Sequence, residues 1–320
     1  MRPAGETALP STATPPEPLP AERETRGHLG ADHARNERRT WIVAVVCALA
    51  LVAQVAGGLA FRSMALTASG LHMAAHVAAM AIAGLAYRMA RRRAEDPRFA
   101  FGTGKFGYLA GFANAVVLAV AAVLIGVESV TRLVRPEAVD YGSALPLAVV
   151  GLIVTLVCLA LLQPPRGAHT HDPDGDLNIA AAHLHLTADA AVGLLAIGGL
   201  AAGRSLGWTW ADPLTGLLGA GLVAQFAASL IRRGAAALLD MNPSPQLAGE
   251  IRDRLQAGGG RVIELHLWRL GPGRFAAVST VAGAAAETIE ALHARLRDIP
   301  SLSHVTIELR GRDETGHGPV

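Results

Sequence analysis

The stretch GLHMAAHVAAM, residues Gly70–Met80, decides how this sequence is interpreted. It lies in an apolar run from Met64 to Tyr87, and a helix needs roughly 20 such residues to cross a bilayer. The run nevertheless carries His72 and His76, four residues apart. An ionisable group inside a membrane span is costly, so by default it marks a pathway or a site in the interior of a helical bundle.

Five further apolar stretches of similar length accompany this one. The chain of 320 residues is 51% hydrophobic and 17% charged, whereas a typical soluble domain is about 25% charged. The sequence therefore predicts an all-α membrane domain of six helices. The expected spans are approximately Trp41–Phe61, Met64–Tyr87, Phe106–Val127, Ala144–Leu162, Ile179–Ala202 and Pro213–Ile231.

Basic residues cluster near alternate ends of these spans. They precede the first span, fill the link after the second and follow the sixth. The positive-inside rule then places both termini in the cytoplasm, which an even number of spans permits. The net charge of +2 gives no basic surface of the kind that nucleic-acid binding needs.

The flanking segments differ in character from the spans. Residues 1–40 are rich in Pro, Ala, Glu and Arg and predict a disordered cytoplasmic arm. Residues 41–240 form the six-span domain. Residues 241–312 show an order of helix, strand, strand, helix and strand, which predicts a small cytoplasmic α+β domain. Residues 313–320 are a tail, and a domain this small would gain from dimerisation.

The fifth span repeats the spacing of the second. In AAHLHLTADAAVG, His185 and Asp189 are four residues apart, so they share a helix face, as His72 and His76 do. Two such pairs on facing helices supply three imidazoles and one carboxylate. That set suits a tetrahedral site for Zn²⁺ or Co²⁺, and imidazole also suits Ni²⁺. The alternative is four polar side chains that only form hydrogen bonds between helices.

Other residues are weaker candidates for metal ligands. His183 lies two residues before His185, on nearly the opposite side of the helix, and is expected to support the site or face another helix. His169 and His171, in the link RGAHTHDPDGDLN, are candidates for weak metal capture, although a solvated acidic loop would look the same. Cys47 and Cys158 each lie alone in an apolar run and are interpreted as small core residues.

Four segments together resemble the cation diffusion facilitator family: SMALTASGLHMAAHVAAM, PRFAFGTGKFGYLAGF, NIAAAHLHLTADAAVG and ELHLWRLGPGRF. RNERRT, the His72/His76 pair and the WADP loop are most similar to its cobalt/nickel efflux branch, often called DmeF-like. The resemblance implies metal efflux by a proton antiporter, usually a homodimer, with a ferredoxin-like cytoplasmic domain. It places the transport ligands at His72, His76, His185 and Asp189.

We therefore expect a multi-pass protein of the bacterial inner membrane that exports Co²⁺ or Ni²⁺, with Zn²⁺ as a further candidate, and that carries no prosthetic group. Metal and protons compete for the same lone pairs, so a proton gradient would favour release outside. Two alternatives stay open. One is a membrane metal sensor without flux. The other is a His-box di-iron membrane enzyme, although such sites need roughly eight histidines and this chain has no adjacent pair.

Overall fold

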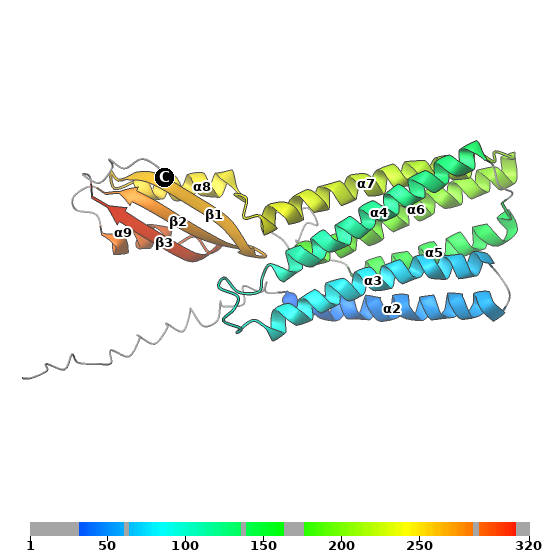
Figure 1. The fold of residues 1–320 in the computed structure, drawn as a ribbon, viewed down its shortest axis with the longest axis horizontal. Coiled ribbons are helices and arrows are strands. Elements are labelled where there is room, and N and C mark those ends of the chain that lie inside the picture. Colours follow the sequence, from blue (N-terminus) through cyan, green and yellow to red (C-terminus); the bar gives the residue numbers. More distant parts are fainter. Residues whose placement is uncertain (1–31, 61–63, 136–138, 163–175, 284–287, 312–320) are drawn as a thin grey trace, which may run out of the picture.

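The structure is a computed structural model that describes residues 32–60, 64–135, 139–162, 176–283 and 288–311. Side chains of residues 57–72 and of Ala75 lie outside the described part. Six long helices form a bundle, and a small mixed domain lies at one end of it (Figure 1). The six helices are α2 (His33–Ala60), α3 (Met64–Arg92), α4 (Phe106–Val134), α5 (Tyr141–Leu161), α6 (Leu177–Leu206) and α7 (Ala211–Leu238).

Length and composition identify the bundle as a membrane domain. Within the described residues, α2, α4, α5, α6 and α7 are each long and apolar enough to cross a membrane. At 1.5 Å per residue, the shortest of them is about 31 Å long, which matches a hydrocarbon core of about 30 Å. Valines and leucines on the outer face of α4, such as Val120, Val123 and Leu124, are exposed. An apolar outer surface of this kind suits lipid rather than water.

The first helix begins earlier than the sequence suggested. α2 starts at His33, inside the residues expected to form an arm, because polar contacts with other helices hold its first turns. The ring of His33 lies 3.0 Å from the carbonyl oxygen of Tyr87, and the amide of Asn36 donates to the Asp176 carboxylate at 3.3 Å. These contacts join residues far apart in the sequence, so apolar periodicity cannot reveal them.

Small residues allow the helices to approach closely. α2 packs on α3, α4 packs on α7, and α6 packs on both α5 and α7. At Gly199 of α6, an added Cβ would lie 2.9 Å from the Cα of Asp212 in α7. At Gly203, it would lie within 2.8 Å of the Tyr141 ring of α5. These two glycines set the spacing of α6 from its neighbours.

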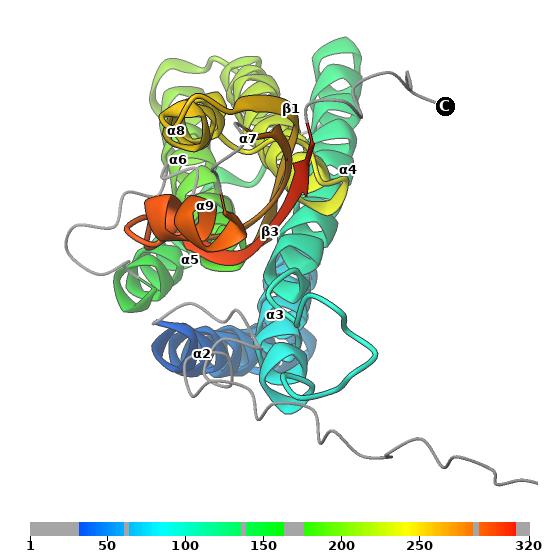
Figure 2. The same ribbon diagram turned by 90° about the vertical axis from the view of Figure 1, so that its left-hand side faces the viewer.

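The C-terminal domain has the order α-β-β-α-β that the sequence predicts. Its elements are α8 (Pro245–Gln256), β1 (Arg261–Gly271), β2 (Arg274–Ala282), α9 (Ile289–Leu296) and β3 (Leu302–Arg310). The sheet has the strand order β1-β2-β3. β2 pairs antiparallel with β1 and parallel with β3. Seen along the bundle, α8 and α9 cover the same face of the sheet (Figure 2). The core between them contains Ile251, Leu255, Phe275, Leu292 and Leu296.

Contacts near the start of α4 attach this domain to the bundle. Arg269 of β1 is 5% exposed, and its guanidinium lies 4.9 Å from the centre of the Phe275 ring. The same group donates to the hydroxyl of Tyr108, in the first turn of α4, at 3.3 Å. Lys105, just before α4, forms an ion pair with Asp240, which follows α7. The domain therefore contacts the bundle end at which α4 begins and α7 ends.

Candidate metal centre

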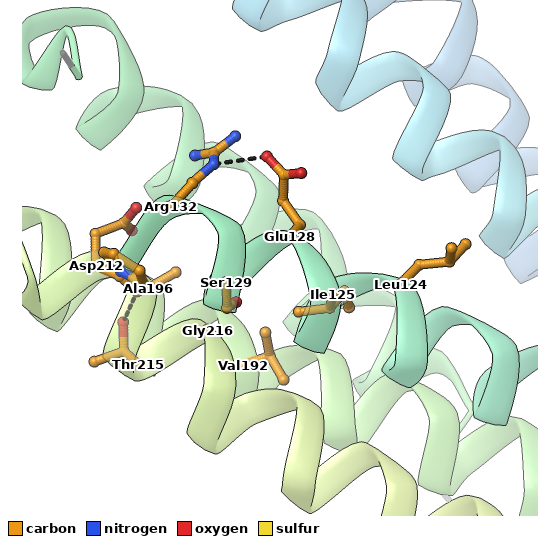
Figure 3. Close-up of a pocket in the computed structure, with 11 residues that line it drawn as sticks. Leu124, Ile125, Glu128, Ser129, Arg132, Val192, Ala196, Asp212, Thr215 and Gly216 are labelled. Atoms are coloured by element: carbon orange, nitrogen blue, oxygen red, sulfur yellow. Dashed lines mark hydrogen bonds and ion pairs between the residues drawn. The ribbon is translucent and has the colours of Figure 1, made fainter. Parts of the chain in front are cut away.

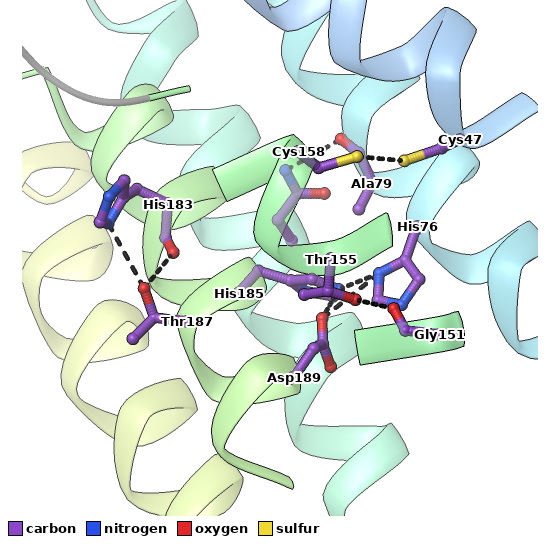
Figure 4. A network of polar contacts seen from close by, with 11 residues as sticks. Cys47, His76, Ala79, Gly151, Thr155, Cys158, His183, His185, Thr187 and Asp189 are labelled. Atoms are coloured by element: carbon purple, nitrogen blue, oxygen red, sulfur yellow. Dashed lines mark hydrogen bonds and ion pairs between the residues drawn. The ribbon is translucent and has the colours of Figure 1, made fainter. Parts of the chain in front are cut away.

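Two helices bring a compact polar cluster into the bundle interior. His76 comes from α3, and His185 and Asp189 come from α6, where their four-residue spacing places them on one face. Nδ1 of His76 lies 3.0 Å from Nε2 of His185. Oδ2 of Asp189 lies 3.3 Å from the first nitrogen and 3.2 Å from the second. Three potential ligand atoms thus form a nearly equilateral triangle (Figure 4).

The size of this triangle suits one face of a tetrahedral metal site. Nitrogen and oxygen ligands lie about 2.0–2.2 Å from Zn²⁺, so neighbouring ligand atoms in a tetrahedron are about 3.3–3.6 Å apart. The three observed separations, 3.0, 3.2 and 3.3 Å, fall a few tenths of an ångström short of that range or within it. Small side-chain shifts would admit an ion and leave its fourth position open to another ligand.

The cluster lies in a largely buried part of the bundle. His76 is 3% exposed and His185 is 7% exposed. The side chain of Asp189 is 15% exposed. Removing two imidazoles and most of a carboxylate from water is costly unless the groups are paired or ligate a metal. The hydroxyl of Thr155 in α5 donates to the Gly151 carbonyl oxygen of its own helix at 3.0 Å (Figure 4).

The other predicted ligands do not join this triangle in the described part of the chain. The side chain of His72 lies outside the described residues, although its backbone is in α3, one helical turn before His76. His169 and His171 also lie outside the described residues. His183 points away from the cluster (Figure 4), and its carbonyl oxygen accepts a hydrogen bond from the Thr187 hydroxyl at 2.8 Å. The two neighbouring histidines of α6 therefore face different surroundings.

A polar network lies between the cluster and the end of the bundle that carries the C-terminal domain. Asp176, which caps α6, accepts hydrogen bonds from the Tyr87 hydroxyl, the Asn36 amide and the backbone N–H of Asn178. The Asn178 side chain donates to the Ala83 carbonyl oxygen of α3 at 3.0 Å. The network ties α2, α3 and α6 together at this end of the bundle.

A pocket with a mainly apolar lining lies at the opposite end of the bundle. It encloses about 420 Å³ between α4, α6 and α7, and none of the three cluster residues lines it (Figure 3). Its Glu128 carboxylate accepts a hydrogen bond from Arg132 at 2.8 Å. A carboxylate already paired with a guanidinium is a poor metal ligand, so the His76 cluster is the better candidate.

Comparison with known proteins agrees with this architecture. Residues 40–239 match the family model described as the cation efflux transmembrane domain. The metal cation efflux system protein CzcD of Cupriavidus metallidurans is 28% identical over 292 residues, which cover 88% of this chain and 90% of that protein. The zinc transporter ZitB of Escherichia coli is 31% identical over 253 residues, 77% of each chain. ZitB of Pectobacterium atrosepticum is 32% identical over 243 residues, 74% of this chain and 72% of that protein.

Proposed function

The chain belongs to the cation efflux family, and from that premise we propose that it exports Co²⁺ or Ni²⁺, with Zn²⁺ as a further substrate, in exchange for protons. At the level of the family, it is an integral membrane transporter of divalent metal cations and not an enzyme. The relatives named above are a metal cation efflux protein and zinc transporters.

One observation carries the proposal for the site. The ligand atoms of His76, His185 and Asp189 form a triangle with sides of 3.0–3.3 Å inside the bundle. We assign these residues as transport ligands and His72, one turn along α3, as the fourth. Three neutral imidazoles and one carboxylate give the site a charge of −1 when empty and +1 with a divalent ion. Proton uptake can take the place of the ion before the site turns inward.

The preference for Co²⁺ and Ni²⁺ rests on sequence. The pair His72/His76 supplies two imidazoles from α3, and imidazole ligands suit Co²⁺, Ni²⁺ and Zn²⁺ alike. The RNERRT and WADP segments resemble the cobalt/nickel branch and favour the first two ions. We further propose a homodimer in the bacterial inner membrane with both termini in the cytoplasm. The positions of the basic residues around the spans support this orientation.

Metal flux into proteoliposomes tests the proposal. The purified protein would be reconstituted with a metal-sensitive dye inside, and the uptake of Co²⁺, Ni²⁺ and Zn²⁺ would be compared with and without a pH gradient. His185→Ala should abolish flux, because it removes a ligand. His183→Ala is the matched control: it lies two residues away on the same helix but points elsewhere. It should retain most of the flux.

The outcomes separate the candidate functions. Gradient-dependent flux that His185→Ala abolishes and His183→Ala retains would support an antiporter with its site at this cluster. Equal flux in both variants would refute the site assignment. Metal binding without flux in the folded wild-type protein would refute transport and favour a membrane metal sensor.

A further inference from the structure

The two cysteines of the chain lie 111 positions apart in the sequence, yet the structure brings them together. Sγ of Cys47 in α2 and Sγ of Cys158 in α5 are 3.7 Å apart (Figure 4). Both are free thiols, and each residue is only 1% exposed. The expectation that both belong to the core is confirmed, but they are a contacting pair rather than two isolated residues. We propose that this pair binds a divalent thiophilic cation of the Cd²⁺ class, at a site separate from the transport ligands.

The separation of the two sulfur atoms suits such an ion. Thiolate sulfur binds Zn²⁺ at about 2.3 Å, so two sulfurs in a tetrahedral site lie about 3.8 Å apart. Around the larger Cd²⁺ they lie slightly farther apart. The observed 3.7 Å therefore needs little helix movement to admit the ion.

The chemistry of the surroundings is also that of a soft-metal site. The buried cluster that contains both cysteines also contains Met73 and Met80, and thiolate and thioether sulfur select soft cations. Binding would release one proton from each thiol, so two thiolates would exactly offset the charge of a divalent ion. A centre that is neutral overall is the form that apolar walls tolerate. A monovalent ion between two thiolates would leave an uncompensated negative charge.

The buried residues around the cysteine pair include neighbours of the proposed transport ligands along α3 and α6. On α3, Met73 precedes His76 by three residues and Met80 follows it by four, so all three share one helix face. Met73 and Met80, which belong to the same buried cluster as the cysteines, therefore lie on the face of α3 that carries His76. The cysteine pair does not depend on the transport proposal, because it uses none of the proposed ligands.

Equilibrium dialysis with Cd²⁺ tests this site on the full-length purified protein. Cd²⁺ would also bind histidine and carboxylate, so the background is His76→Ala/Asp189→Ala, which removes two transport ligands. We expect this background to bind one more Cd²⁺ per chain than the same background with Cys47→Ser/Cys158→Ser. It should also show ultraviolet absorbance from thiolate-to-Cd²⁺ charge transfer. Either single serine substitution should weaken Cd²⁺ binding at least tenfold.

One control variant and one fallback measurement separate metal ligation from packing. Val43→Ala removes packing from the same cluster, one turn before Cys47, but keeps both thiols. It should retain the bound Cd²⁺ and the absorbance, whereas their loss would show that packing, not ligation, matters and would overturn the proposal. Equal Cd²⁺ uptake with and without the cysteines would also overturn it. Should the serine variants fail to fold, bound Cd²⁺ without thiolate absorbance in the His76→Ala/Asp189→Ala protein would refute the site by itself.

Discussion

Asp189→Asn is the sharpest perturbation of the proposed transport site, because it changes charge and almost nothing else. Asp189 is the only anionic member of the described cluster, and its Oδ2 lies 3.2 and 3.3 Å from the two imidazole nitrogens. Asparagine keeps the shape of the side chain and an amide oxygen. The proposed ligand set changes from −1 to neutral when empty, and from +1 to +2 when a divalent ion is bound.

The size of the effect follows from burial. Removing one partner of a buried charge pair costs about 3–5 kcal/mol, because the remaining charge is left uncompensated. Since 1.4 kcal/mol is a factor of ten, Asp189→Asn should weaken Co²⁺ binding by roughly 10²- to 10⁴-fold. Metal binding also requires neutral imidazoles, so the comparison must be made at one fixed pH.

Equilibrium dialysis of the purified protein against Co²⁺ measures this change. Asp212→Asn is the matched control, because Asp212 is a carboxylate of a neighbouring span that lines the other pocket and lies outside the cluster (Figure 3). The control should change the Kd for Co²⁺ by less than about threefold, a difference of about 0.7 kcal/mol. A folded Asp189→Asn protein whose Kd also stays within that range would refute the assignment of Asp189 as a ligand.

Three further predictions concern packing, the C-terminal core and the cysteine pair. Gly199→Ala should lower the thermal stability of the purified protein, by about 1–3 kcal/mol of overpacking, because its Cβ would meet the α7 backbone. Gly198→Ala is the control and should leave the stability unchanged, because an added Cβ there would have no neighbour within 4 Å. Equal losses of stability in the two variants would contradict the close packing of α6 on α7. Leu292→Ala should destabilise the C-terminal domain by about 2–5 kcal/mol in urea unfolding followed by tryptophan fluorescence, since Leu292 is fully buried. Exposed Ile289→Ala is its control, and a similar loss there would refute the assigned core. Cd²⁺ should slow wild-type Co²⁺ flux even at saturating Co²⁺, because bridging the thiols ties α2 to α5. In Cys47→Ser, saturating Co²⁺ should abolish the inhibition by Cd²⁺. Inhibition that persists would contradict a Cd²⁺ bridge between the two cysteines.

Local patterns in the sequence were enough to predict the main elements. Length and continuous apolarity identify membrane helices because a bilayer demands both, and five of the six spans are seen as such in the described residues. The α-β-β-α-β order of the C-terminal domain follows from start and stop signals, such as Ser244, whose hydroxyl accepts from the Leu247 N–H at 3.1 Å. The spacing of His185 and Asp189 fixes a shared helix face whatever the tertiary arrangement is.

Such local patterns could not predict contacts between residues far apart in the sequence. The start of α2 at His33 depends on contacts with Tyr87 and Asp176, which no window of local sequence contains. The pairing of Cys47 with Cys158 depends on how α2 and α5 pack, and each cysteine alone looks like any small core residue. The different surroundings of His183 and His185 could be predicted in part. Helical geometry separates the two side chains, but only the packing shows which of them faces α3.

The division of the proposed ligands between two helices has a mechanical consequence. His76 belongs to α3, whereas His185 and Asp189 belong to α6, and the three ligand atoms lie 3.0–3.3 Å apart. Metal–ligand bonds of about 2.0–2.2 Å tolerate only small changes, so a relative shift of these helices by about 1 Å would leave an ion with ligands from one helix alone. Affinity at this site therefore depends on how α3 sits against α6. A transported ion must be held tightly in one state and weakly in the other, and only a difference in affinity can couple binding to a change of state. At the end carrying the C-terminal domain, a movement of α3 against α6 would strain the hydrogen bonds that join α3 to Asp176, the cap of α6, and to Asn178 of α6.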